Sequence, residues 1–170
     1  VVSWMSGEGF TTTVFPQSIG IASTWNPELV RQEAEVISDE ARALANQLNN
    51  TKFLNFWSPM INMARDPRWG RTQESYGEDP FLVSEISKAF IQGLQGNDPK
   101  YIKTAASIKH FIANNVDYHR HYGSSNISEK LLRDYYFPAF KANVLESNVQ
   151  IVMSAYNALN NEPCSSKDWL

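Results

Sequence analysis

Residues 52–94 read KFLNFWSPMINMARDPRWGRTQESYGEDPFLVSEISKAFIQGL, and this stretch decides the fold class. Its first part, residues 52–63, has the length and apolar composition of a buried strand. A charged loop containing Pro and Gly follows. From Asp79–Pro80 onward, apolar residues recur at the three-to-four spacing of a helix that begins with a capping side chain and a proline. The stretch therefore predicts a strand, a long loop and a helix, which form one βα unit.

The same alternation continues on both sides of this unit. The further predicted elements are strands at 18–24, 104–112 and 149–156, and helices at 26–47 and 128–146. Asn26–Pro27–Glu28 supplies three helix-start signals in a row, and Pro138 should kink the last helix. Strands that alternate with helices predict a parallel sheet with crossover helices, in either an open doubly wound sheet or part of a (β/α)8 barrel.

Length and charge limit the function classes. The 170 residues have the length of one domain, and the net charge of -3 with scattered lysines and arginines gives little support for nucleic-acid binding. No apolar run approaches the roughly 18–20 residues of a membrane span. Cys164 is the only cysteine, so it excludes an internal disulfide and does not decide the compartment. Val1 is no start methionine and Lys167–Leu170 resembles a helix beginning, so we interpret the chain as a fragment.

The loop within Ser58–Pro80 is a candidate ligand-binding loop. Loops of about 15 residues without structure of their own are usually functional or disordered, and Met60, Ile61, Trp69 and Tyr76 give this one apolar surface to bury. Its arginine forks suit a hydroxyl-rich ligand or a carboxylate, although ion pairs that merely hold the loop remain an alternative. The polar segments 64–78, 109–122 and 156–161 all follow strands, so we expect them to converge. Neither GxGxxG nor GxxxxGK[ST] is present, which disfavours nucleotide binding.

Lys109 and His110 stand together at the end of an otherwise apolar strand. Lysine is seldom buried without a partner, so the pair indicates a site. Adjacent strand residues point to opposite faces, so both can line one site only if the backbone leaves the pleat through a bulge or a strained or cis peptide.

Two alternatives use other residues. His110, His119 and His121 with Asp117 suggest a metal, but their spacings match no common zinc pattern. A Cys164 nucleophile with a histidine base is weaker still, because a small buried thiol is the default.

Four segments carry a resemblance to a known family: TVFPQSIGIASTWNPEL, SPMINMARDPRWGRTQESYGEDP, KHFIANN and MSAYNALNNEPC, in that order. With them the chain resembles the amino-terminal domain of glycoside hydrolase family 3, the exo-acting β-glucosidases, β-xylosidases and related enzymes. The resemblance implies an α/β fold that is a partial (β/α)8 barrel of about four βα units, incomplete at both ends. It also implies that residues 1–170 are one fragment of that domain, with no second domain.

The resemblance also implies site residues. The implied substrate-binding residues are Arg71, Lys109, His110, Arg120, Tyr156 and, weakly, Glu8. Tyr156 falls where the family places a tyrosine beside the nucleophile, and Glu8 lies in a segment that is shortened here. The family mechanism is retaining, with an aspartate nucleophile and a glutamate acid/base. Both are expected downstream of Leu170, and Asp168 is too early to be either, so no catalytic residue is expected in this chain.

The implied function is that of a parent retaining exo-β-glycosidase, which releases terminal β-D-glucose or β-D-xylose from the non-reducing end of plant-type oligosaccharides. The expected substrate is an oligosaccharide or aryl β-glycoside, with no cofactor, metal, nucleic acid or membrane partner, and the fragment alone is expected to be inactive. One alternative is a non-catalytic sugar-binding relative of the same fold. Another is a metal- or nucleotide-dependent α/β enzyme. Family members are often secreted or periplasmic, but this sequence determines neither compartment nor oligomeric state.

Overall fold

The computed structural model describes residues 11–170. Its helices are α1 (Ser18–Ala22), α2 (Pro27–Leu48), α3 (Pro80–Gln95), α4 (Glu129–Leu131) and α5 (Phe137–Glu146), with a π-helical turn, η4 (Leu132–Tyr136), between the last two. Its strands are β1 (Asn55–Phe56), β2 (Ala105–Phe111), β3 (Ser124–Ser125), β4 (Ile151–Ser154), β5 (Ala158–Leu159) and β6 (Glu162–Pro163). Short 3-10 turns, η2 (Thr51–Leu54), η3 (Thr72–Glu74) and η5 (Cys164–Ser166), complete the order. Glu8 lies outside the described residues.

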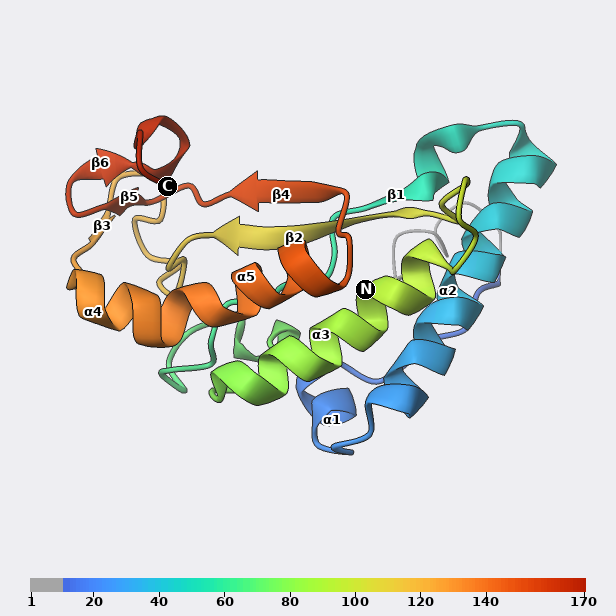
Figure 1. Cartoon of the computed structure of the whole chain (residues 1–170), viewed down its shortest axis with the longest axis horizontal. Coiled ribbons are helices and arrows are strands. Elements are labelled where there is room, and N and C mark those ends of the chain that lie inside the picture. The colour runs from blue at the N-terminus through green and yellow to red at the C-terminus, as the bar shows by residue number, and fades with distance from the viewer. Residues whose placement is uncertain (1–10) are drawn as a thin grey trace.

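The main sheet has the strand order β1-β2-β4, and both pairings are parallel. The chain crosses from β1 to β2 through α3 and from β2 to β4 through α4 and α5. Figure 1 shows these helices on one side of the sheet, with α2 against α3. A smaller sheet, β3-β5-β6, joins the loop after β2 to the loop after β4. This arrangement is the parallel, helix-covered sheet that the sequence predicts, and it is consistent with part of a barrel.

The two long helices begin and end where the sequence indicates. The Asn26 side chain accepts a hydrogen bond from the Leu29 N–H at 3.1 Å, and Asn49 ends α2 in the left-handed conformation. In α3, Asp79 accepts from the Leu82 N–H at 2.7 Å, with proline in the first turn. Both predicted helices are therefore confirmed.

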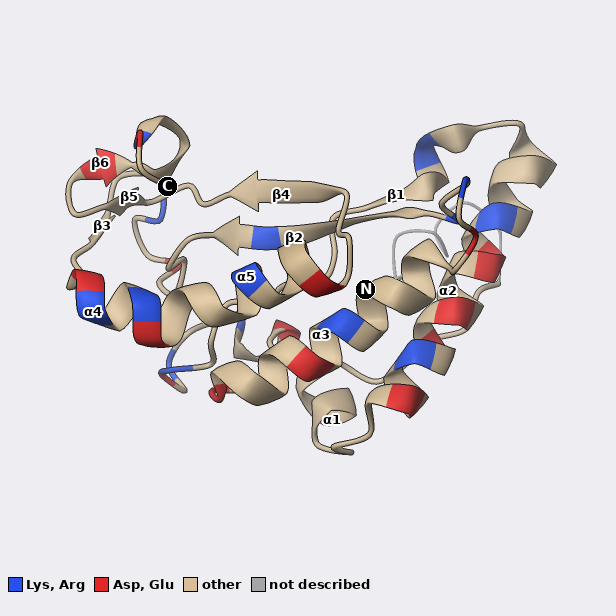
Figure 2. Ribbon diagram, in the orientation of Figure 1, with Lys and Arg blue, Asp and Glu red and all other residues tan. Residues whose placement is uncertain are grey.

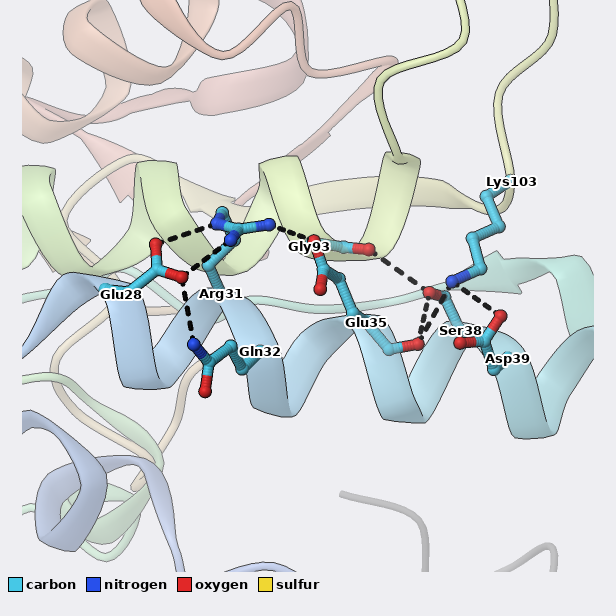
Figure 3. A network of polar contacts seen from close by, with 8 residues as sticks. All are labelled: Glu28, Arg31, Gln32, Glu35, Ser38, Asp39, Gly93 and Lys103. Atoms are coloured by element: carbon cyan, nitrogen blue, oxygen red, sulfur yellow. Dashed lines mark hydrogen bonds and ion pairs between the residues drawn. The ribbon is translucent and has the colours of Figure 1, made fainter.

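Helices α2 and α3 approach closely at Gly93, where a side chain would not fit. A Cβ added there would lie 2.3 Å from the Arg31 carbonyl oxygen and 2.7 Å from the Ala34 Cβ. Polar contacts flank this point: Ser38 Oγ donates to the Gly93 carbonyl at 3.1 Å, and Lys103 Nζ lies 2.7 Å from Asp39 Oδ1 (Figure 3). The glycine thus sets the distance between the two helices.

The predicted strand at Ser18–Thr24 is wrong, because residues Ser18–Ala22 form α1. Ile21 and Ala22 are buried while Gly20 and Ser23 are exposed, so the segment buries one helical face. A short apolar run cannot by itself distinguish a strand from a buried helical turn. Three of the four predicted strands therefore form the main sheet, and the chain enters that sheet at β1.

The predicted strand at residues 52–63 is regular only at Asn55–Phe56, after the turn η2. The chain nevertheless continues beside β2: Ser107 N–H donates to the Ser58 carbonyl at 3.0 Å, and Ile61 N–H donates to the Lys109 carbonyl at 2.9 Å. Pro59 has no N–H to donate, but its carbonyl accepts from the Lys109 N–H at 3.2 Å.

The predicted helix at 128–146 is present in three pieces, α4, η4 and α5. Pro138 lies in the first turn of α5, directly after the π-helical turn. Proline cannot donate to the carbonyl of the preceding turn, so the predicted irregularity at Pro138 is confirmed.

The apolar core lies between the sheet and the helices. Its fully buried members include Val30, Val83, Ile86, Ile91, Leu94, Ile108, Ile112 and Leu132. On the outer helices, acidic residues stand beside basic ones along α2 and α4 (Figure 2). None of the helices in residues 11–170 is long and apolar enough to cross a membrane.

Candidate functional site

Lys109 and His110 end β2 beside the loop that follows β1. The peptide bond between them is cis, and the pairing of β2 with β4 shifts register between Lys109 and Phe111. The charges of Arg71 and Glu74 act on the pKa of both side chains, so both lie near this pair, and the His110 ring contacts Arg71 directly. The departure from the pleat that the sequence requires for a shared site is therefore present.

Asn62 holds His110 through three hydrogen bonds. Its Oδ1 accepts from the His110 backbone N–H at 2.9 Å and lies 3.1 Å from the ring Nδ1, and its Nδ2 donates to the His110 carbonyl at 2.9 Å. Each of the two residues is only 2% exposed. Burial, followed by the charges of Arg71 and Lys109, lowers the pKa of His110 to about 3. The imidazole is therefore neutral at neutral pH.

Arg71 reaches from the loop to the histidine. Its Nε and Nη2 donate to the two carboxylate oxygens of Glu74, each at 2.7 Å, and its Nη1 lies 3.4 Å from His110 Nε2. Glu74 lies three residues after Arg71, and the turn η3 brings its carboxylate against the Arg71 guanidinium. This ion pair lowers the pKa of Glu74, so its carboxylate is ionised and occupied.

Lys109 differs from its neighbours because its ammonium has no partner in the part of the chain that the structure describes. Within residues 11–170, no hydrogen bond or ion pair engages Lys109 Nζ. Burial and, next, the charge of Arg71 lower the pKa of Lys109. A partly buried cation with three free donors is poised for an oxygen-rich ligand.

Arg120 and Tyr156 border the same group. The Arg120 guanidinium carbon lies 5.4 Å from the Tyr156 ring centroid, and the Tyr156 and His110 rings are 6.3 Å apart. Asp117 Oδ1 is 3.9 Å from Arg120 Nη1. Tyr156 is 44% exposed, so its ring presents a face at the rim of the site. Cationic donors and an aromatic face are the groups that hydrogen-bond and pack against a polyhydroxylated ring.

Comparison with known proteins identifies the family. Residues 5–170 match the family described as glycosyl hydrolase family 3 N terminal domain. The chain belongs to glycosyl hydrolase family 3. The fold class predicted from the sequence, an α/β chain forming part of the family's barrel domain, is thereby confirmed.

The relatives in family 3 are much longer than this chain. Exo-1,4-beta-xylosidase bxlB of Emericella nidulans is 38% identical over 169 residues, which cover 97% of this chain and 22% of that protein. Beta-D-xylosidase 3 of Arabidopsis thaliana is 39% identical over 176 residues, covering 99% and 22%. The chain thus spans about a fifth of the length of these relatives.

Solved family 3 structures share the fold. A GH3 exo-beta-xylosidase, XlnD, in complex with a xylobiose aziridine activity-based probe, matches with a TM-score of 0.88 and 32% identity, over 93% of this chain and 21% of that one. Beta-glucosidase 3B from Thermotoga neapolitana, in complex with glucose, matches with a TM-score of 0.81 and 36% identity, over 93% and 20%.

The structure brings together five of the residues named from the sequence. They are Arg71, Lys109, His110, Arg120 and Tyr156. Glu8 lies outside the described residues. His119 and His121 lie on the loop after β2, and residues 11–170 hold no group of three His, Cys, Asp or Glu side chains placed to bind a metal ion. Burial raises the pKa of the Cys164 thiol, which does not favour its use as a nucleophile.

The other two arginines of the loop contact residues that hold the loop in place. Arg68 pairs with Asp66 at 2.6 Å. Arg65 instead contacts the Tyr136 hydroxyl and lies over the Tyr135 ring. Of the acidic residues nearby, Glu74 binds Arg71, and Asp79 caps α3. The sequence reasoning missed Asn62, although a polar residue inside the apolar run Met60–Met63 was a usable signal.

The buried neutral His110 predicts an acid-sensitive fold. Its pKa is lowered from 6.5 to about 3, so between these values the unfolded state binds a proton that the folded state does not. The free energy of unfolding should therefore fall with acidification across this window, by up to about 1.4 kcal/mol per pH unit from this group. Urea unfolding of the intact protein at pH 4–7 measures this slope. His110→Gln should reduce this slope by up to the contribution of one bound proton. An unchanged slope would contradict the lowered pKa of His110 in the folded state.

Proposed function

We propose that residues 1–170 are part of the amino-terminal barrel domain of a larger exo-β-glycosidase. In this role the chain supplies the hydroxyl-binding half of the active site. The enzyme releases a terminal β-D-xylose, or alternatively β-D-glucose, from the non-reducing end of a plant-type oligosaccharide or from an aryl β-glycoside. The xylose assignment comes first because the names of the similar curated proteins are mostly those of β-xylosidases.

The proposal rests on the Lys109 ammonium, which has no partner among residues 11–170 and lies near His110 and Arg71 in a family 3 chain. Lys109 donates to a sugar hydroxyl, and Arg71 remains held by Glu74 while its Nη1 reaches the site. Arg120 and Tyr156 close the rim. These donors strengthen their bonds as the ring gains oxocarbenium character, which favours the transition state over the bound substrate.

The reaction proceeds with retention of configuration through two carboxylates. An aspartate attacks the anomeric carbon, and a glutamate first protonates the leaving group and then activates water. Both belong to parts of the larger enzyme outside residues 1–170. Glu74 serves neither role, because both of its oxygens are bound to Arg71. Residues 1–170 alone therefore bind sugar weakly at most and do not hydrolyse it.

Hydrolysis of two aryl glycosides tests this function. The larger protein that contains this chain should release nitrophenol from an aryl β-D-xyloside faster than from the β-D-glucoside, and the first sugar formed should be the β-anomer, as proton NMR of the fresh product reports. Residues 1–170 alone should release none. Binding of xylose without any hydrolysis by the larger protein would instead favour a non-catalytic sugar-binding relative. Hydrolysis by residues 1–170 alone would overturn the division of the site.

A further inference from the structure

The orientation of the Asn62 amide is fixed by the backbone of His110. The His110 N–H requires an acceptor and its carbonyl requires a donor, and Asn62 meets them with Oδ1 at 2.9 Å and Nδ2 at 2.9 Å. Exchanging the two amide atoms would set donor against donor and acceptor against acceptor, with both residues buried. The atom 3.1 Å from the ring Nδ1 is therefore the carbonyl oxygen Oδ1.

An acceptor beside Nδ1 decides where the imidazole carries its proton. A neutral imidazole has one N–H, and it lies at Nδ1, where Oδ1 accepts it. Nε2 is then a bare acceptor, which agrees with the Arg71 Nη1 donor 3.4 Å away. Among residues 11–170, the charged groups that act on the ring are Arg71, Lys109 and Arg120, which disfavour an imidazolium, and Glu74, which favours one. The cations outnumber the single carboxylate, and that carboxylate is already paired with Arg71.

We propose that Asn62 is a positioning residue that holds His110 as a neutral, Nδ1-protonated imidazole whose Nε2 only accepts hydrogen bonds. The consequence for recognition rests on the function proposed above. A sugar hydroxyl that takes the place of Arg71 Nη1 at Nε2 must donate its hydrogen there, so its oxygen is left to accept from Lys109 or Arg71. Hydrogen-bond direction at this hydroxyl is therefore set by a side chain that touches no sugar. An analogue with fluorine at that position keeps an acceptor for Lys109 or Arg71 but has no hydrogen to donate to Nε2, so it should bind more weakly than the sugar with the hydroxyl.

The tautomer can be measured without any activity. In the intact protein labelled with [15N]histidine, with His110 assigned by loss of its signals in His110→Gln, long-range 1H–15N spectra at pH 6–8 should show Nδ1 protonated and Nε2 unprotonated. A ring protonated at Nε2, or at both nitrogens, would overturn the proposal. This outcome is independent of the proposed function: an inactive protein can show the stated tautomer, and an active one can fail to show it.

Two substitutions of Asn62 separate positioning from packing. Asn62→Leu conserves volume and removes the acceptor, so the ring should populate the Nε2-protonated form, and kcat/KM for the aryl β-xyloside should fall roughly tenfold to a hundredfold. Asn62→Asp keeps an acceptor at Nδ1 and adds a negative charge, so the pKa of His110 should rise and the imidazolium should appear as the pH falls. If Asn62→Leu does not fold, Asn62→Asp and the wild-type spectrum still test whether Asn62 sets the protonation of His110.

Asn143 offers a matched control on α5. It is a fully buried asparagine that donates to Ser87 Oγ at 2.7 Å and to the Ala139 carbonyl at 2.8 Å. Asn143→Leu should lower stability while leaving the His110 ring signals unchanged. Equal changes of those signals in Asn143→Leu and Asn62→Leu would show a general packing effect and overturn the positioning role.

Discussion

Lys109→Met is expected to lower kcat/KM of the intact protein for an aryl β-glycoside by about 2–4 kcal/mol of transition-state stabilisation, roughly 30- to 1,000-fold. Methionine keeps most of the apolar stem and removes the ammonium, which has no partner within residues 11–170. The substitution should therefore weaken the interaction with the substrate and leave the stability of the fold nearly unchanged. Steady-state kinetics with aryl β-xyloside, together with the unfolding midpoint, measure the two effects separately.

Lys141 provides the control for this substitution. It is an exposed lysine on α5 with no partner among the described residues. Lys141→Met should leave both kcat/KM and stability nearly unchanged. Wild-type kinetics in Lys109→Met would remove Lys109 from the site, and a large loss of stability in that variant would assign the lysine to the fold instead.

Gly93→Ala is expected to destabilise the protein, which is the opposite of the usual effect of this change in a helix. Alanine normally gains up to about 1 kcal/mol over glycine in a helix interior. At Gly93 the added Cβ would lie 2.3 Å from the Arg31 carbonyl oxygen, and a helix backbone cannot yield as a flexible side chain can (Figure 3). Helices α2 and α3 must separate, at a cost of about 1–3 kcal/mol or more. Urea unfolding of the variant measures this loss.

Gly20 is the matched position for this test. It is exposed in α1, and an added Cβ would meet only the Pro16 Cβ at 3.9 Å. Gly20→Ala should therefore be neutral or slightly stabilising. Stabilisation by Gly93→Ala would mean that the two helices do not approach as closely as the structure has them.

Local signals were sufficient for the long helices but not for the short elements. Asn26–Pro27 and Asp79–Pro80 mark the starts of α2 and α3. The Asn26 and Asp79 side chains cap these helices as expected. The run at Ser18–Ala22 was misassigned because five residues contain too little periodicity to separate a helical turn from a strand. Whether such a run forms a strand or a helical turn depends on the residues that pack against it, and these are not known from the sequence.

The site was predictable where chemistry is concentrated in one segment. Lys109–His110 and the arginine loop were identified because polar residues at the ends of parallel strands converge, and the family resemblance singled out Arg71 within that loop. The partners of these residues were not predictable in the same way. Glu74 had several arginines within reach, and only the turn η3 directs it to Arg71. Asn62 acts across the sheet on a residue that is distant in sequence, and a single sequence holds no record of that contact.

A crystal structure of the intact protein with xylose bound tests the proposed sugar site most directly. The proposed function predicts sugar hydroxyls within hydrogen-bond distance of Lys109 Nζ and Arg71 Nη1, beside His110 Nε2 and under the Tyr156 ring. A sugar bound elsewhere, with the Lys109 ammonium still without a ligand, would contradict it.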